Sequence, residues 1–274
     1  MIALLLACSG DPEITTAPEP AGPLTVSTTD WPAHYLVERI GGQHVSATCI
    51  LPAGEDPPAW QPPGEVVAAL ADADLIVTNG AGFSAWMATA SLPSAKVVET
   101  ATAVELIEFA GATHSHGVEG DHSHAGIDPH TWSDPQSYGL QAGTVRDALT
   151  GVDPAHAEAY AANTAALLAE LEVLDQSLAV ATADLVELEM AANHPAFNYL
   201  ARRYDLSIQS FDVEGEALGA WAEGREDPVM LWETTPGLEI VGLRDVELDP
   251  LESGEPYDYL AQARANVVVL DGIL

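Results

Sequence analysis

Short apolar runs alternate with helix-sized segments through most of this chain, and this rhythm limits the folds open to it. Apolar runs at residues 24–28, 45–51, 75–78 and 96–98 are each followed by a segment long enough for a helix or a turn. The rhythm resumes further along, with runs at 190–193, 206–211, 229–232 and 246–248. Such alternation is typical of parallel sheets covered by helices. We therefore expect an α/β fold made of two small doubly wound lobes.

A long helix is predicted between the two halves. It would begin at Asp153-Pro154, because Asp suits the capping position and Pro the first helical position. Apolar and small residues then recur at three- and four-residue spacing, which predicts one buried stripe. The stripe comprises Tyr160, Thr164, Leu167, Leu171, Leu174 and Leu178. A helix of roughly 30 residues would be about 45 Å long, enough to join both lobes as a backbone.

These elements predict a division of the chain. Residues 24–150 form an N-terminal α/β lobe that carries a His-rich loop at 113–127, residues 151–187 form the connecting helix, and residues 188–274 form a C-terminal α/β lobe. Residues 1–23 precede the first strand and contain several prolines, which favours an extended tether. No later stretch has the apolar length needed to span a bilayer.

The first residues resemble the end of a bacterial lipoprotein signal. An apolar run leads to Leu-Leu-Ala-Cys8, followed by Ser and Gly, and in such signals the cysteine receives a lipid anchor. The basic segment that opens a signal peptide is absent, and the apolar run is short. Two interpretations remain, a start codon placed too late or an incidental cysteine, and we favour the first. Cys8 is then the expected lipid anchor, in an extracytoplasmic or periplasmic location.

The charge of the chain excludes one class of partner. The formal net charge is −34, whereas 47% of the residues are apolar, so a core is expected beneath an acidic surface. A field of this sign repels phosphate backbones, which argues against nucleic-acid binding. It concentrates cations, although a general solvation role for the acidic surface is an alternative.

One segment is rich in histidine. His114, His116, His122 and His124 lie among Gly, Ser and acidic residues, and His130 follows closely, so five of the nine histidines fall here. No apolar periodicity survives in the segment, so it cannot build a core. Imidazole and carboxylate groups at this density favour binding of a divalent cation. An expression tag and an inert surface loop are the alternatives.

Three further polar residues follow predicted strands or end the His-rich loop. His194 follows the run at 190–193, Asp249 follows the run at 246–248, and His130 lies in Asp128-Pro-His-Thr-Trp132. Ligands gather beyond the carboxyl ends of strands in open parallel sheets. Each residue alone is more often a structural hydrogen bonder, but together they predict one metal site between the lobes.

Four ordered segments carry a resemblance to a known family. They are Leu51-Pro-Ala-Gly-Glu-Asp-Pro-Pro-Ala-Trp-Gln-Pro62, Asp128-Pro-His-Thr-Trp132, His194-Pro-Ala-Phe-Asn-Tyr-Leu-Ala-Arg-Arg-Tyr-Asp-Leu206 and Asp249-Pro-Leu251. In this order they resemble the substrate-binding proteins of ABC importers for zinc and manganese, the cluster A-I group. The His-rich loop ahead of the second segment is similar to that of the zinc-specific members.

The resemblance implies a fold, partners and ligands. It implies two lobes joined by a stiff helix, with the metal held between them by His130, His194 and Asp249. It also implies delivery to an ABC permease and its ATPase, with the membrane reached only through the lipid anchor; we expect a monomer.

One of the family's ligands is missing, because its first histidine falls at Pro58, which has no donor atom. The fourth ligand would then be Glu55, Asp56, water or, as we favour, a loop histidine such as His116 or His124. Glu233 is a reserve carboxylate.

The donor set favours zinc. Two or three imidazoles with one carboxylate suit Zn²⁺, whereas manganese favours more oxygen ligands. A zinc-dependent hydrolase is a rival, because two His and one Asp with an open position also form a catalytic pattern. The chain has no HExxH sequence and no distinctive general base, so we expect a non-enzyme. A zinc buffer or adhesin without a transporter is the other rival.

Overall fold

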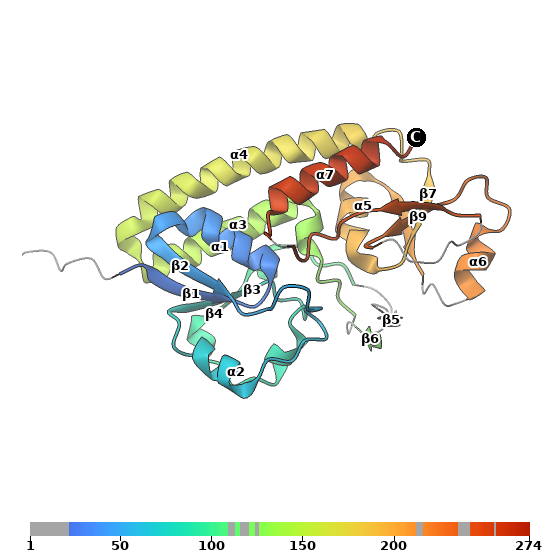
Figure 1. Cartoon of the computed structure of the whole chain (residues 1–274). Helices are drawn as coiled ribbons and strands as arrows, with labels where there is room; N and C mark the ends of the chain where they lie inside the picture. Colours follow the sequence, from blue (N-terminus) through green and yellow to red (C-terminus); the bar gives the residue numbers. More distant parts are fainter. Residues whose placement is uncertain are drawn as a thin grey trace, which may run out of the picture.

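The computed structural model describes residues 22–108, 113–115, 121–123, 126–211, 216–234, 242–254 and 256–274. These residues form two parallel-sheet α/β lobes, as expected from the alternation of short apolar runs. Figure 1 shows the two sheets side by side beneath one long helix, α4.

The first lobe is built on a four-stranded parallel sheet. Its strands lie in the order β2-β1-β3-β4, and β3 is buried along its whole length. The strands are β1 (Leu24–Thr28), β2 (Val45–Cys49), β3 (Leu75–Thr78) and β4 (Val97–Glu99). The helices of this lobe are α1 (Trp31–Gly41), α2 (Gly64–Leu70) and α3 (Pro135–Val152).

Local sequence explains where α1 begins and ends. The Asp30 carboxylate accepts a hydrogen bond from the Ala33 backbone N–H at 2.9 Å, and Pro32 stands in the first turn. These are the residue types that start helices. The helix ends before Gly42, whose φ of 52° is readily adopted by glycine.

The second lobe repeats the strand order of the first. Its parallel sheet has the strand order β10-β9-β7-β8. Read from the opposite edge this order is β8-β7-β9-β10, so the second, first, third and fourth strands of the lobe follow one another as in β2-β1-β3-β4. The strands are β7 (Glu189–Ala192), β8 (Ser207–Ser210), β9 (Val229–Trp232) and β10 (Arg244–Glu247). The helices are α5 (Asn198–Tyr204), α6 (Glu216–Ala222) and α7 (Tyr259–Asp271). In both sheets the chain therefore leaves its first strand toward one edge and then crosses to the other.

The connecting helix α4 spans Ala157–Ala181, 25 residues, or about 38 Å. It is shorter than expected, and residues 154–156 form a separate 3₁₀ turn. The six residues of the predicted stripe are all buried. Asp153 does not cap α4, because its carboxylate instead lies 2.6 Å from His156 Nδ1 and accepts a hydrogen bond from the Tyr160 hydroxyl. The residue boundaries predicted for the lobes stay a prediction.

The core runs through both lobes without a break. One cluster of buried apolar residues extends from Val26 in β1, along Leu167 and Leu174 of α4, to Leu231 in β9. Helix α4 packs against α1 and α3 in the first lobe and against α7 in the second (Figure 1). The connecting helix is thus part of the hydrophobic framework rather than a bare linker.

A two-stranded antiparallel ladder lies within the His-rich segment. It pairs β5 (Thr113–Ser115) with β6 (Asp121–Ser123), and the register places His114 opposite His122. His116 and His124 lie outside the described residues, as does Cys8.

Candidate metal site

The carboxyl ends of the two sheets carry the polar residues expected to form a site. His194 follows β7 and Glu233 follows β9, on either side of the point where the chain reverses direction across the second sheet. In the first lobe, Asn79 follows β3, and its side chain donates a hydrogen bond to the Pro129 carbonyl at 2.8 Å. This bond anchors the loop that bears His130 at the equivalent edge. Ligands of open parallel sheets gather at such reversal points.

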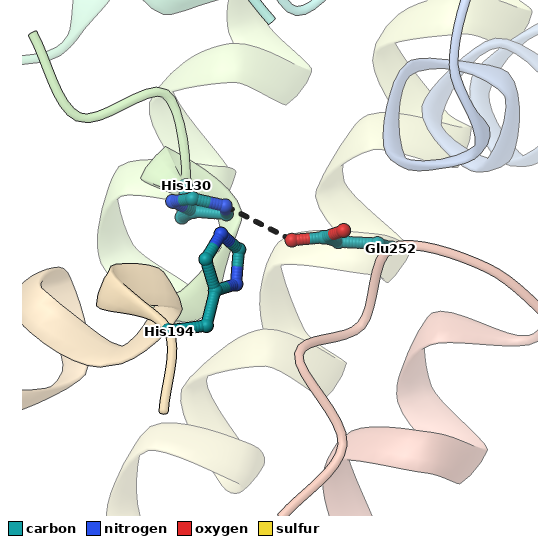
Figure 2. Close-up of side chains that lie close together, drawn as sticks. All are labelled: His130, His194 and Glu252. Carbon is teal, nitrogen blue, oxygen red and sulfur yellow. Dashed lines mark ion pairs between the residues drawn. The ribbon is translucent and has the colours of Figure 1, made fainter. Parts of the chain in front are cut away.

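Three side chains converge there. His130, His194 and Glu252 each offer one ligand atom, and these three atoms lie within 4.8 Å of one another. Figure 2 shows the two imidazoles crossing at a steep angle, with the Glu252 carboxylate reaching toward them from a separate loop. His130 Nε2 lies 2.9 Å from Glu252 Oε1. All three side chains are buried, His130 completely. No other group of this kind is found among the residues that the structure describes.

The loop at residues 128–132 fixes the orientation of His130. One carboxylate oxygen of Asp128 accepts the His130 backbone N–H at 2.9 Å and lies 2.6 Å from the ring Nδ1. The other ring nitrogen, Nε2, is therefore directed to Glu252. Burial alone lowers the pKa of His130, but the Asp128 and Glu252 carboxylates outweigh this and raise it to about 10. A metal ion that binds at Nε2 must displace a proton there.

Contacts between the lobes hold this loop in place. The Trp132 indole N–H donates to the Pro250 carbonyl at 2.9 Å, and the Tyr259 hydroxyl donates to the Trp132 carbonyl at 2.7 Å. Both partners of Trp132 belong to the second lobe. The loop carrying His130 therefore packs directly against the loop carrying Glu252.

His194 is presented by the end of β7. Its backbone is extended, with φ −141° and ψ 146°, and Pro195 begins a 3₁₀ turn that leads into α5. The ring Nδ1 contacts the carboxylate of Glu233, which follows the neighbouring strand β9. The centroids of the His130 and His194 rings are 4.7 Å apart. The two histidines predicted from the sequence thus meet, although they come from different lobes.

Asp249 is placed differently from the sequence prediction. It lies outside the group of three, and its carboxylate accepts hydrogen bonds from the Leu251 backbone N–H at 2.7 Å and from Gln262 Nε2 at 3.1 Å. Burial raises the pKa of Asp249, and the nearby carboxylates of Glu247 and Glu233 raise it further. The role of Asp249 as a metal ligand stays a prediction.

Glu252 was not singled out from the sequence. It stands three residues beyond Asp249, in the same turn, and a second carboxylate so close to a predicted ligand was the available signal. A bend at residues 251 and 252 follows Asp249, so either carboxylate is a candidate for the site. Only the folded chain shows which of the two meets the imidazoles.

A pocket of about 590 Å³ opens beside the three residues. Carboxylates from both lobes line it, and Glu252 belongs to both the pocket and the group of three. Its acidic lining residues are Glu55, Asp56, Glu233, Glu247, Asp249 and Glu252. Pro58, at the position of the missing family histidine, is buried. The alternative fourth ligands Glu55 and Asp56 therefore lie on the same side of the molecule as the site.

The donor atoms suit a borderline divalent cation. Two imidazole nitrogens and one carboxylate oxygen form a set that zinc accepts in tetrahedral sites with one further position. Among the described residues Cys49 is the only cysteine, and it offers no competing thiolate, because it is half-buried and burial raises the pKa of its thiol to about 12. In the described part of the chain, the helices are all too short or too polar to cross a bilayer.

Comparisons with known proteins find a matching family and several relatives. The model of the family described as zinc-uptake complex component A, periplasmic (ZnuA) matches residues 26–222. The zinc-binding lipoprotein AdcA of Streptococcus pneumoniae serotype 4 is 27% identical over 209 residues, covering 74% of this chain and 40% of AdcA. This chain therefore spans less than half the length of that relative.

Two more similarities bear on the metal and the fold. The manganese-binding lipoprotein MntA of Halalkalibacterium halodurans is 28% identical over 217 residues, covering 78% of this chain and 67% of MntA. The crystal structure of the metal-dependent lipoprotein YcdH from Bacillus subtilis aligns with a TM-score of 0.77 at 21% identity, over 90% of this chain and 98% of that chain. The structural similarity shows the fold.

Proposed function

This chain belongs to the ZnuA family of periplasmic zinc-uptake components, and from that premise we propose that it captures zinc outside the cytoplasm and delivers it to an ABC importer. The observation that carries the proposal is the meeting of His130, His194 and Glu252 at the junction of the two lobes. Family membership supports a metal-binding substrate-binding protein. The choice of metal, the ligands and the partners are the proposed part.

Zinc is proposed over manganese because of the donor types. Two of the three converging ligand atoms are imidazole nitrogens, whereas Mn²⁺ favours sites dominated by oxygen. Relatives described as zinc-binding and as manganese-binding both match this chain, so similarity alone does not select the metal. We therefore expect tight binding of one zinc ion and much weaker binding of manganese.

Calorimetric titration of the purified protein tests the site. The wild type should take up one zinc ion tightly, and His194→Ala should lose that tight binding because one of three converging donors is removed. His44→Ala is the matched control. His44 lies just before β2, at the amino-terminal ends of the strands, whereas the loop that bears His130 lies at their carboxyl ends. A tight site that persists in His194→Ala, or one lost equally in His44→Ala, would contradict the proposal.

The fourth ligand is proposed to come from the His-rich segment. His116 and His124 are the favoured donors, and Glu55, Asp56 and water are the alternatives. Replacement of His114, His116, His122 and His124 by serine should abolish weak binding of additional zinc ions and lower the affinity of the tight site. If the tight site keeps its full affinity in this variant, an oxygen donor completes the coordination instead.

Delivery and location are tested in cells. A strain lacking this protein should grow poorly when zinc is chelated, and the wild-type gene should restore growth while His194→Ala should not. Full growth without the protein would favour a buffering role.

Attachment of a lipid to Cys8 is tested by labelling with a radioactive fatty acid, and Cys8→Ala should abolish the label. We expect a monomer by sedimentation. Zinc-loaded protein should hydrolyse neither generic esters nor phosphoesters.

A further inference from the structure

One short segment of the second lobe contains His194 and also contacts Asp128, the residue that orients His130. His194 lies at its start, and Asn198 and Tyr199 follow within the first turn of α5. Both later residues reach across to Asp128, the residue behind His130 in the first lobe. The Asn198 side chain donates to Asp128 Oδ2 at 2.9 Å, and the Tyr199 hydroxyl donates to the Asp128 carbonyl at 2.8 Å.

Asp128 divides its two carboxylate oxygens between the lobes. Oδ1 faces its own loop, where it accepts the His130 backbone N–H and lies 2.6 Å from His130 Nδ1. Oδ2 faces the second lobe and accepts the amide of Asn198. Asp128 and His130 are both completely buried, so water does not compete for these positions in the folded protein. The orientation of the carboxylate is thus set by a donor on each side.

The hydrogen bond to Asp128 affects how His130 binds a metal. An ionised carboxylate only accepts hydrogen bonds, so Nδ1 keeps its proton and Nε2 is the nitrogen that binds a metal once the metal has displaced the proton there. Carboxylates in this position fix the tautomer and ring orientation of a ligating histidine and increase its basicity, and their loss typically lowers metal affinity by about 10- to 100-fold. A change in the orientation of Asp128 is therefore transmitted to the metal through His130.

We propose that Asn198 is a positioning residue for the metal, because it holds Asp128 from the second lobe and thereby keeps His130 in its binding orientation only while the lobes are docked. This inference rests on the proposed function, since it assumes that His130 binds the cation. The chain Asn198–Asp128–His130 joins the two lobes on the side away from the metal, and the metal joins them on the other side through His194. Separation of α5 from the loop at 128–132 then weakens both imidazole contacts together, which gives a route for release.

Asn198→Leu tests the proposal, because leucine has nearly the same size as asparagine and cannot donate. The first measurement is zinc dissociation, followed by transfer to a chelator; we expect it to be about 10- to 100-fold faster than in the wild type. The second is the nitrogen NMR signal of His130 Nδ1 and its proton in the metal-free protein, which should shift in the variant. A purely structural role of Asn198 would leave that signal unchanged.

Arg203→Ala is the matched control on the same helix. Arg203 binds Asp175 of α4 through two hydrogen bonds of 2.9 and 2.7 Å, so its loss loosens α5 without touching Asp128. We expect this variant to unfold more easily while its zinc dissociation and its His130 signal stay near those of the wild type. Equally fast dissociation in Arg203→Ala would overturn the proposal, because docking of α5 in general would then explain the effect.

Two results in Asn198→Leu would also overturn it, namely dissociation at the wild-type rate and an unchanged Nδ1 signal. Failure of the proposed function looks different, because the wild type itself would then lack a tight zinc site that depends on His194. The NMR measurement needs no metal, so it reports on the connection between Asn198 and His130 in that case too.

Discussion

Replacement of Glu252 by glutamine should weaken zinc binding far more than replacement of Asp249 by asparagine. Both changes keep the size of the side chain and remove one negative charge. Glu252 Oε1 lies within the group of converging donors, whereas the Asp249 carboxylate is occupied by the Leu251 backbone N–H and the Gln262 amide. The comparison therefore separates a residue that would touch the metal from one that shapes the turn beside it.

The size of each effect follows from these contacts. Structural zinc sites with four ligands contribute about 10–16 kcal/mol, so one ligand accounts for about 3 kcal/mol. At about 1.4 kcal/mol per tenfold change, Glu252→Gln should raise the Kd on the order of 100-fold. Asn at position 249 keeps a carbonyl oxygen that can accept the Leu251 N–H. We therefore expect Asp249→Asn to raise the Kd by about tenfold, the lower end of the range for residues behind the ligands.

Competition with a zinc chelator of known affinity, at fixed pH and ionic strength, measures both values. Thermal unfolding of the metal-free variants shows whether each one still folds. If Asp249→Asn costs 100-fold or more while Glu252→Gln costs less than tenfold, Asp249 is the metal ligand and the turn rearranges when zinc binds. Equal losses in both variants would mean that the two carboxylates act as one unit.

Further predictions concern the framework and its response to pH and zinc. Leu171 lies in the buried stripe of α4, and Leu171→Ala should lower the free energy of unfolding in urea by about 2–5 kcal/mol. The control is Val173→Ala on the same helix: the Val173 side chain is 58% exposed, so the change should be about 0.5 kcal/mol or less. Similar losses in both variants would contradict the packing described. Burial alone raises the pKa of Asp175, but its hydrogen bonds from Arg203 and Tyr204 outweigh this and lower it below the ordinary value near 3.8. The stability from this carboxylate is therefore present above pH 4 and lost as the pH falls through the lowered pKa. The free energy of unfolding of Asp175→Asn should be about 1–3 kcal/mol below that of the wild type at pH 7, and this difference should shrink in acid. A pH-independent difference would refute the assignment. Zinc at 100 times its Kd should add about 2.7 kcal/mol to the free energy of unfolding, a gain visible in calorimetry that His194→Ala should lack.

The framework was predictable because its signals are local and repeated. The apolar run at 229–232 is β9 to the residue, and the stripe from Tyr160 to Leu178 is buried at each of its six positions. Burial of a periodic face dominates the energy of such elements, so the sequence pattern decides them. The start of α4 was not predictable in the same way, because the carboxylate of Asp153 has two nearby partners, His156 and Tyr160, that compete with the backbone.

The site was predictable only in part. His130 and His194 each follow a recognisable local signal, a strand end or a proline-fixed loop, and the structure brings them together. The choice between Asp249 and Glu252 depends on the backbone between them. Leu251 has a φ of 62°, a left-handed conformation that is unfavourable for a branched side chain, and it is buried in the core. Tertiary packing imposes that turn, so no local pattern indicates which carboxylate faces the imidazoles.

The two sheets have the same strand order, and in both the residues that stabilise the fold are different from the residues that would bind the ion. In the described part of the chain, the three converging donors His130, His194 and Glu252 all lie in loops, outside the strands of the two sheets and outside α4. Exchange of one loop residue therefore alters the hardness and charge of the coordination cage and leaves the apolar scaffold intact. A single substitution in one of these loops can therefore change which cation the protein prefers without loss of the fold.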